Sequence, residues 1–125
     1  PVEVLPEKAE ALSLPPASID TVLVTYALCT IPDPIRALAG ARRVLKPGGK
    51  LLFCEHGLAP DADVARTQAR VEPIWKRIAG GCHLTRDIPA LITQSGFRLG
   101  GVECMYLPST PRFSGYNVWG EAQPS

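Results

Sequence analysis

The stretch Val44-Leu45-Lys46-Pro47-Gly48-Gly49-Lys50-Leu51-Leu52-Phe53 decides the fold of this chain. Proline cannot continue a helix, and the glycine pair can adopt the positive φ that a helix C-cap and a tight turn require. The run from Leu51 to Cys54 has no polar residue, as expected for a strand buried on both faces of a parallel sheet. The stretch therefore predicts a helix, a turn and a strand of an α/β fold, in which ligands bind beyond the carboxyl ends of the strands.

The flanking sequence extends this unit to a β-α-β-α-α-β-β order. A segment rich in β-branched residues predicts the first strand, and Asp33 followed by Pro34 is typical of a helix N-terminus. The expected strands cover 19–26, 50–55, 97–107 and 113–122, and the expected helices 34–45, 63–79 and 88–95. The first two strands should be parallel with a right-handed crossover, and the last should be antiparallel to the third.

The second predicted helix has the clearest local signals. Asp61 or Asp63 could cap it, Gly80-Gly81 should end it, and Pro73 indicates a kink or a break. Its predicted apolar face consists of Val64, Val71, Ile74, Trp75 and Ile78. In the third strand, Gly100-Gly101 indicates a β-bulge.

Composition narrows the class of protein. A chain of 125 residues with a formal charge of +1 is expected to form one domain, with no preference for nucleic acid. No apolar run approaches the roughly 20 residues that span a bilayer, so we expect no membrane span. The four cysteines form no CxxC pair, and we interpret them as reduced thiols of a cytoplasmic protein.

The first predicted strand would be an exposed hydrophobic edge. Stable proteins rarely leave such an edge uncovered, because it can pair with another chain. Either an N-terminal portion or a second chain should cover it. A homodimer formed through this edge strand is therefore one prediction.

Three groups of residues resemble the class I S-adenosylmethionine-dependent methyltransferases. They are Ala9-Glu10-Ala11-Leu12-x-Leu14-Pro15, then Ser18-Ile19-Asp20-Thr21-Val22, then Arg42-Arg43-Val44-Leu45-Lys46-Pro47-Gly48-Gly49. The pattern is similar to the small-molecule branch that includes the ubiquinone/menaquinone-type enzymes. The segment from Trp75 to Arg86 resembles the microsomal methyltransferase-like proteins that methylate thiols more closely still.

The resemblance implies a Rossmann-like three-layer sandwich, of which this chain is a part. The family's glycine-rich loop and the acidic residue after its second strand have no counterpart before Asp20. The chain is therefore expected to be a single partial domain over 1–125, with a lead-in over 1–19. Residues 20–125 would be the C-terminal half of the sheet, equivalent to strands 4–7 of seven, with the last strand antiparallel.

The resemblance also implies S-adenosyl-L-methionine as the cofactor and places two segments beside it. The first is Ala9-Glu10, near the adenine. The second follows the first strand and contains Tyr26, Ala27, Leu28 and Cys29. Loops at this end of an α/β sheet are the expected ligand contacts, although Tyr26 and Leu28 could instead pack beneath the loop.

His56 is the candidate catalytic residue, because it follows the second strand and its ordinary pKa lies near neutrality. It could deprotonate an O–H, N–H or S–H acceptor, or it could cap the strand end without a chemical role. Methyl transfer from a sulfonium needs in-line positioning and a deprotonated acceptor, so a strict catalytic residue is not required.

Trp75, His83 and Arg86, together with His56, are the candidate substrate-binding residues, since their segment often covers the acceptor in the family. Trp75 could equally be a core residue, and His83 and Arg86 could stabilise a turn. Cys29, Cys54 and His56 could converge at the strand ends, but their spacing matches no compact zinc pattern, so no metal is predicted.

The sequence thus predicts an enzyme that moves a methyl group in line from S-adenosyl-L-methionine to a small molecule. The alternative is a non-catalytic fragment or interaction module that pairs through its exposed edge strand, with an incomplete cofactor site.

Overall fold

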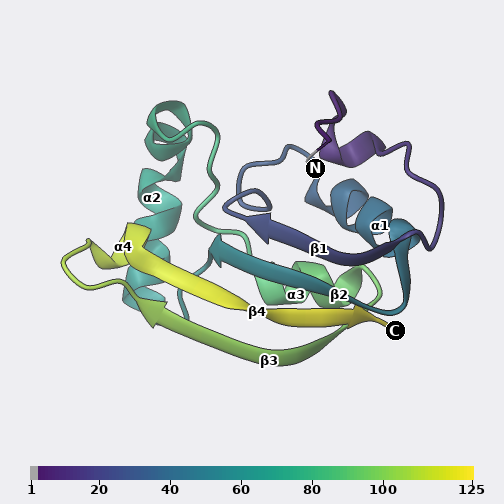
Figure 1. Ribbon diagram of the computed structural model, residues 1–125. Helices are drawn as coiled ribbons and strands as arrows, with labels where there is room; N and C mark the ends of the chain where they lie inside the picture. Colours follow the sequence, from purple (N-terminus) through teal and green to yellow (C-terminus); the bar gives the residue numbers. More distant parts are fainter. Residues whose placement is uncertain (1–2) are drawn as a thin grey trace.

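The computed structural model describes residues 3–125. Its elements follow the predicted order, with two short helices added (Figure 1). The strands are β1 (Ile19–Thr25), β2 (Leu45–His56), β3 (Phe97–Tyr106) and β4 (Tyr116–Pro124). The helices are η1 (Ala9–Ala11), α1 (Pro34–Val44), α2 (Ala62–Ile78), α3 (Ile88–Gln94) and α4 (Arg112–Gly115).

The four strands form one mixed sheet in the order β1-β2-β4-β3. β1 and β2 are parallel, and β4 is antiparallel to both β2 and β3, which confirms the predicted directions. The predicted bulge in β3 is also present, as a register shift between Leu99 and Val102. β1 pairs only with β2 among the described residues, so it is an edge strand.

The core lies between the sheet and helices α1 and α3. Leu51 and Phe53 of β2 point into it with Leu38 of α1 and Ile88 and Ile92 of α3, and all five are nearly inaccessible to solvent. No helix of the described residues packs over the opposite face of the sheet, and α2 lies beyond the carboxyl ends of β1 and β2 (Figure 1). The described residues thus form two layers of the expected sandwich.

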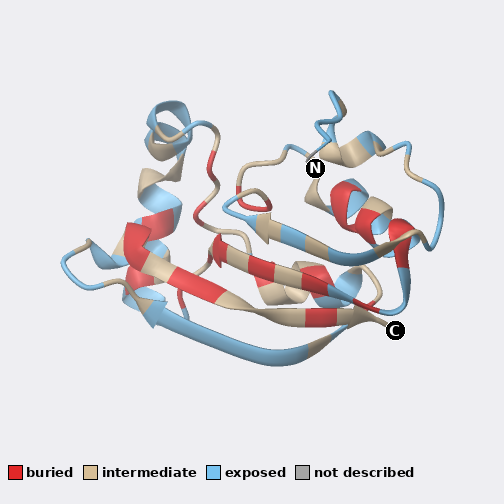
Figure 2. Ribbon diagram, in the orientation of Figure 1, coloured by how far each residue is buried: buried red, intermediate tan, exposed pale blue. Residues whose placement is uncertain are grey.

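Two strands that were expected to be buried are partly exposed on the face opposite the core. The run from Leu51 to Cys54 is buried on the core face only, because Leu52 and Cys54 are half-buried on the other face. β1 alternates between half-buried and exposed residues and is not a buried strand (Figure 2). Its Leu23 is 69% exposed.

The predicted turn at Pro47-Gly48-Gly49 is not a separate element, because β2 begins at Leu45 and runs through these residues. α1 begins at Pro34 with the Asp33 carboxylate accepting the Arg36 backbone N–H, and it ends at Val44, before Pro47. Only Gly48 has a positive φ, of 80°. Gly49 serves close approach instead, since a Cβ there would lie 2.9 Å from the Asp20 carbonyl oxygen of β1.

The predicted apolar face of α2 is wrong in part. Val64 is buried, but Ile74 and Ile78 are 69% and 73% exposed. The helix runs on through Pro73 and stops before Gly80 and Gly81, which both have a positive φ. Its main buried polar contact is Gln68, a residue that hydrophobic periodicity passes over.

Candidate functional site

The loop that follows β1 turns sharply at Tyr26. This residue has φ = 50°, a conformation that non-glycine residues adopt rarely and that is often found at functional sites. Its backbone N–H still donates to the Cys54 carbonyl of β2, and its hydroxyl donates to Asn117 Oδ1 of β4 at 2.6 Å. Tyr26 is therefore held by β2 and β4 at the carboxyl ends of β1 and β2.

A buried carboxylate fixes the rest of this loop. Glu55 is completely inaccessible to solvent, and its two oxygens accept the backbone N–H groups of Ala27 and Cys29, each at 3.2 Å. Burial raises the pKa of Glu55 to about 7, although these two hydrogen bonds favour the charged form. The sequence reasoning placed Glu55 at the end of β2 but gave it no role.

His56 and Tyr26 form one wall of a cavity. Their rings stack with centroids 4.6 Å apart, and His56 Nδ1 is buried without a hydrogen-bond partner among the described residues. Burial lowers the pKa of His56, so the imidazole is neutral at pH 7. A neutral imidazole with an unoccupied ring nitrogen can accept a proton.

The cavity has a volume of about 150 Å³. Its lining comes from the loop after β1, the end of β2 and the C-terminal end of α2. The lining residues are Tyr26, Cys29, Thr30, His56, Trp75, Ala79 and Cys82. Four predicted site residues (Tyr26, Cys29, His56 and Trp75) therefore converge on one cavity. Cys82, which the predicted site did not include, joins them.

Arg86 and His83 bind the loop from its outer side. Arg86 Nη1 donates to the carbonyls of Leu28 and Ile31 at 2.7 and 2.6 Å. The His83 backbone N–H donates to the Cys29 carbonyl, and His83 Nδ1 lies 3.1 Å from the same oxygen. In this structure both side chains therefore position the loop, and neither lines the cavity.

These contacts occupy most of the hydrogen-bonding groups of the loop backbone. The Ala27 carbonyl accepts from Thr30 and Ile31, and the N–H groups of Ala27 and Cys29 bind Glu55. Leu28 packs its side chain into the core. A ligand would consequently meet the shape of the loop and the side chains of Tyr26 and Cys29, with few free backbone groups.

Ala9 and Glu10 lie elsewhere, in η1, which packs on α1. Glu10 lines a shallow groove with Arg36, Gly40 and Arg43 of α1. This groove does not share lining residues with the Tyr26–His56 cavity. The two predicted cofactor segments therefore occupy separate surfaces of the described chain.

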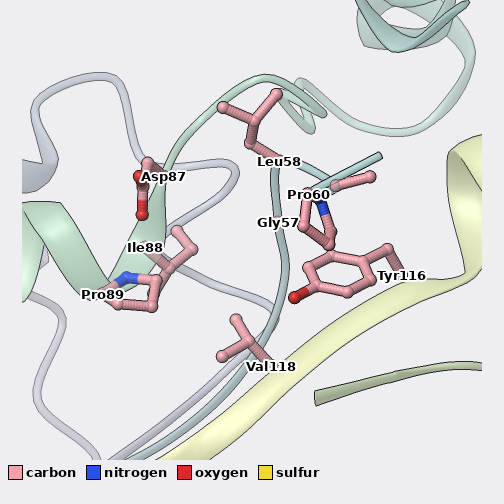
Figure 3. Close-up of a pocket in the computed structure, with 9 residues that line it drawn as sticks. Gly57, Leu58, Pro60, Asp87, Ile88, Pro89, Tyr116 and Val118 are labelled. Carbon is pink, nitrogen blue, oxygen red and sulfur yellow. The ribbon is translucent and has the colours of Figure 1, made fainter. Parts of the chain in front are cut away.

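A second cavity, of about 260 Å³, lies between the loop after β2, the N-terminal end of α3 and β4 (Figure 3). The labelled residues Leu58, Pro60, Ile88 and Val118 make its walls largely apolar, and the Tyr116 ring closes one side. Asp87 at its rim accepts the Ala90 backbone N–H and so serves as the cap of α3.

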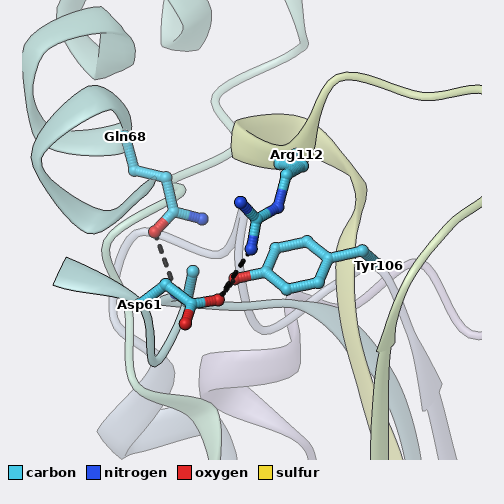
Figure 4. A network of polar contacts seen from close by, with 5 residues as sticks. Asp61, Gln68, Tyr106 and Arg112 are labelled. Carbon is cyan, nitrogen blue, oxygen red and sulfur yellow. Dashed lines mark hydrogen bonds and ion pairs between the residues drawn. The ribbon is translucent and has the colours of Figure 1, made fainter. Parts of the chain in front are cut away.

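Two polar networks fix the loop beneath that cavity (Figure 4). Buried Gln68 accepts the Ala59 N–H and donates to the carbonyls of Gly57 and Phe113. Asp61, at the N-cap of α2, accepts from the Tyr106 hydroxyl and from Arg112. The Asp61 side chain therefore ties α2 to β3 and α4 instead of capping its own helix.

Among residues 3–125, no cluster of three or more His, Cys, Asp or Glu side chains could hold a metal ion. Nor does any helix within that range have the length and apolar content to cross a membrane.

The cavity lies at the carboxyl ends of two parallel strands, which is where open α/β sheets bind their ligands. A family model described as "Methyltransferase domain" matches residues 1–53. The thiol S-methyltransferase TMT1B of Rattus norvegicus is 47% identical over 72 residues, which are 57% of this chain and 30% of that protein. The ubiquinone/menaquinone biosynthesis C-methyltransferase UbiE of a Marinomonas species is 41% identical over 54 residues, 43% of this chain and 22% of the relative.

Several solved structures have the same fold as this chain. A putative methyltransferase from Bacillus halodurans superimposes with a TM-score of 0.75 at 16% identity, covering 95% of this chain and 70% of that one. A S-adenosylmethionine-dependent methyltransferase from Thermotoga maritima gives 0.70 at 21% identity, with 99% and 65% coverage. The chain is similar in sequence to methyltransferases over part of its length, and it shares the fold of solved methyltransferases over nearly all of it. The matched segments span less than a third of the length of the curated relatives.

Proposed function

We propose that this chain is the acceptor-side part of a S-adenosyl-L-methionine-dependent methyltransferase that acts on a small molecule. The observation that carries the proposal is the convergence of Tyr26, His56 and Trp75 on one cavity at the carboxyl ends of β1 and β2. The named relatives are methyltransferases of small molecules, and the similarity to TMT1B supports a thiol as the acceptor.

The aromatic side chains of Tyr26, His56 and Trp75 at the cavity fit a flat or apolar acceptor. Tyr26 and Cys29 are the cofactor-side contacts, together with Ala27 and Leu28, which shape the loop, and with Ala9 and Glu10 on η1. When bound, the cofactor supplies an electrophilic methyl group on a positively charged sulfur. Because the loop backbone is already hydrogen-bonded, recognition there depends on surface complementarity and aromatic contact.

His56 is the proposed general base. Its unpartnered Nδ1 and its lowered pKa both favour a neutral imidazole that accepts the proton of an acceptor S–H, O–H or N–H. Trp75 forms the opposite wall and excludes water from the acceptor. His83 and Arg86 contribute to substrate binding through the loop that they hold. The remaining requirement is in-line placement of the acceptor atom.

Calorimetric titration of the chain with S-adenosylhomocysteine tests cofactor binding. We expect saturable binding to the chain that weakens at least roughly tenfold in Tyr26→Ala, because that substitution removes the stacked wall of the cavity. Arg70→Ala, on the exposed face of α2, is the matched control. Heat changes no larger than those of dilution would refute a cofactor site in this chain.

The second candidate function is an interaction module that pairs through β1, and a specific observation favours it. β1 has one strand partner among the described residues and exposes Leu23 on its surface. An unpaired, apolar edge can add a strand from a second copy of the chain, giving a homodimer. This reading requires no bound cofactor.

A further inference from the structure

Two cysteines from distant parts of the sequence meet at the Tyr26–His56 cavity. Cys29 follows β1, and Cys82 follows α2. The backbone N–H of His83, the residue after Cys82, donates to the Cys29 carbonyl at 2.6 Å, so the two loops are joined directly. Both side chains are almost fully buried, at 1% and 4% exposure, and both line the same cavity.

The pKa values of the two thiols are shifted in opposite directions by their surroundings. The neighbouring Cys29 thiol lowers the pKa of Cys82 to about 7, and the positive charge of Arg86 acts in the same direction. The same pairing and burial raise the pKa of Cys29 above its ordinary range. Trp75 Nε1 is buried at the same cavity and has no hydrogen-bond partner among the described residues.

A lowered pKa, as at Cys82, is not expected for a thiol that serves only to pack the core. Buried cysteines in apolar surroundings have a raised pKa and are inert, whereas reactive ones have donors and positive charge nearby. Cys82 has the positive charge of Arg86 nearby and lines a cavity. A second thiol beside it is the arrangement that resolves a mixed disulfide.

We propose that Cys29 and Cys82 form a redox-active dithiol that reduces a small organic disulfide in the cavity. The Cys82 thiolate attacks one sulfur of the disulfide R–S–S–R, which forms a Cys82–S–S–R bond and releases one thiolate, RS⁻. The Cys29 thiol then loses its proton and attacks the Cys82 sulfur, which forms the Cys29–Cys82 disulfide and releases the second RS⁻. The protons of the two cysteines protonate the two leaving groups, so the dithiol loses two electrons and R–S–S–R gains them as two thiols.

The cavity volume of about 150 Å³ limits the substrate to a compact disulfide. This activity goes beyond methyl transfer and uses neither a methyl donor nor the proposed base. It would supply a free small thiol at the position where the proposed methyl acceptor binds.

The test uses the chain with Cys54→Ser and Cys104→Ser, which leaves only the pair. The reduced chain is mixed with bis(2-hydroxyethyl) disulfide, and released thiol and intact mass are followed together. We expect two thiols released per chain and a mass lower by two hydrogens. Adding Cys29→Ser should stop the reaction at one released thiol, with one 2-mercaptoethanol half bound to Cys82. Adding Cys82→Ser should slow the release at least roughly tenfold.

A parent chain that releases no thiol, or that retains one or two 2-mercaptoethanol halves, would overturn the proposal. Equal rates in the two serine variants would also overturn it, because they would remove the distinction between the attacking and the resolving thiol. The result on the parent chain does not depend on the folding of either variant. Since no methyl donor is present, failure here is separate from failure to bind S-adenosylhomocysteine.

Discussion

Glu55 shows how one residue controls the geometry of the site. It is the only carboxylate among the fully buried residues of the described chain, and it holds the backbone of Ala27 and Cys29 in place. Its titratable neighbours include the thiols of Cys29 and Cys82. Replacing it should therefore change both the loop and the pH dependence of folding.

We expect Glu55→Gln to remove one pH dependence of stability. The pKa of Glu55 is about 7 in the folded chain and 4.5 ordinarily, so the folded state holds its proton over a range where the unfolded state has lost it. The stability that this provides is complete below about pH 4.5 and is lost as the pH rises through about 7. Urea unfolding should show the wild type losing roughly 3 kcal/mol relative to the variant between those limits. Parallel profiles for the two proteins would contradict the assignment.

Arg86 is the second residue whose role can be measured directly. Arg86→Met removes the donor for the Leu28 and Ile31 carbonyls, so we expect a loss of about 2 kcal/mol in the free energy of unfolding. Arg70→Met on α2 is the matched control, because Arg70 is exposed and makes no hydrogen bond among the described residues. Unchanged stability of Arg86→Met would instead favour direct recognition of the acceptor.

At the scale of elements, the β3 bulge is set by a close approach of two strands. A Cβ at Gly120 of β4 would lie 3.0 Å from Val102 Cα and would press on the Gly101 carbonyl. A Cβ at Gly101 would meet nothing within 4 Å. The bulge therefore depends on the glycine of the partner strand more than on its own.

Gly120→Ala should lower the free energy of unfolding by about 2 kcal/mol, because the backbone of β3 must move away from β4. Gly101→Ala, in the same bulge but in open space, should change it by less than about 0.5 kcal/mol. Thermal or urea unfolding of both variants gives the comparison. Equal losses would mean that the bulge, and not the strand contact, is sensitive to substitution.

At the scale of the whole molecule, β1 is an open edge beside an uncovered face of the sheet (Figure 2). Leu23→Lys should weaken self-association at least roughly tenfold if copies pair through β1, since a lysine on an edge strand opposes pairing. Ile74→Lys is matched to it, because both side chains are 69% exposed and Ile74 lies on α2. Sedimentation of the two variants at several concentrations measures the difference. If both substitutions weakened self-association equally, copies of the chain would not pair specifically through β1.

Local sequence signals determined the element order, the parallel pair β1–β2, the antiparallel pair β3–β4, the start of α1 at Asp33-Pro34 and the end of α2 before Gly80. These features follow from proline, glycine and capping chemistry, and from hydrophobic runs, which act over a few residues. The same signals located the cavity, because the carboxyl ends of parallel strands carry the ligand side of the fold.

Only the tertiary structure decided which side chains meet. Periodicity assigned Ile74 and Ile78 to a buried face, yet the described residues place nothing over them. It gave no signal for Gln68 or Glu55, whose burial depends on backbone groups distant in sequence. The pairing of Cys29 with Cys82, and the attachment of Arg86 to the loop, join residues more than 50 positions apart. A pattern of neighbouring residues cannot predict such contacts. They stabilise the protein only after the sheet has brought the loops together.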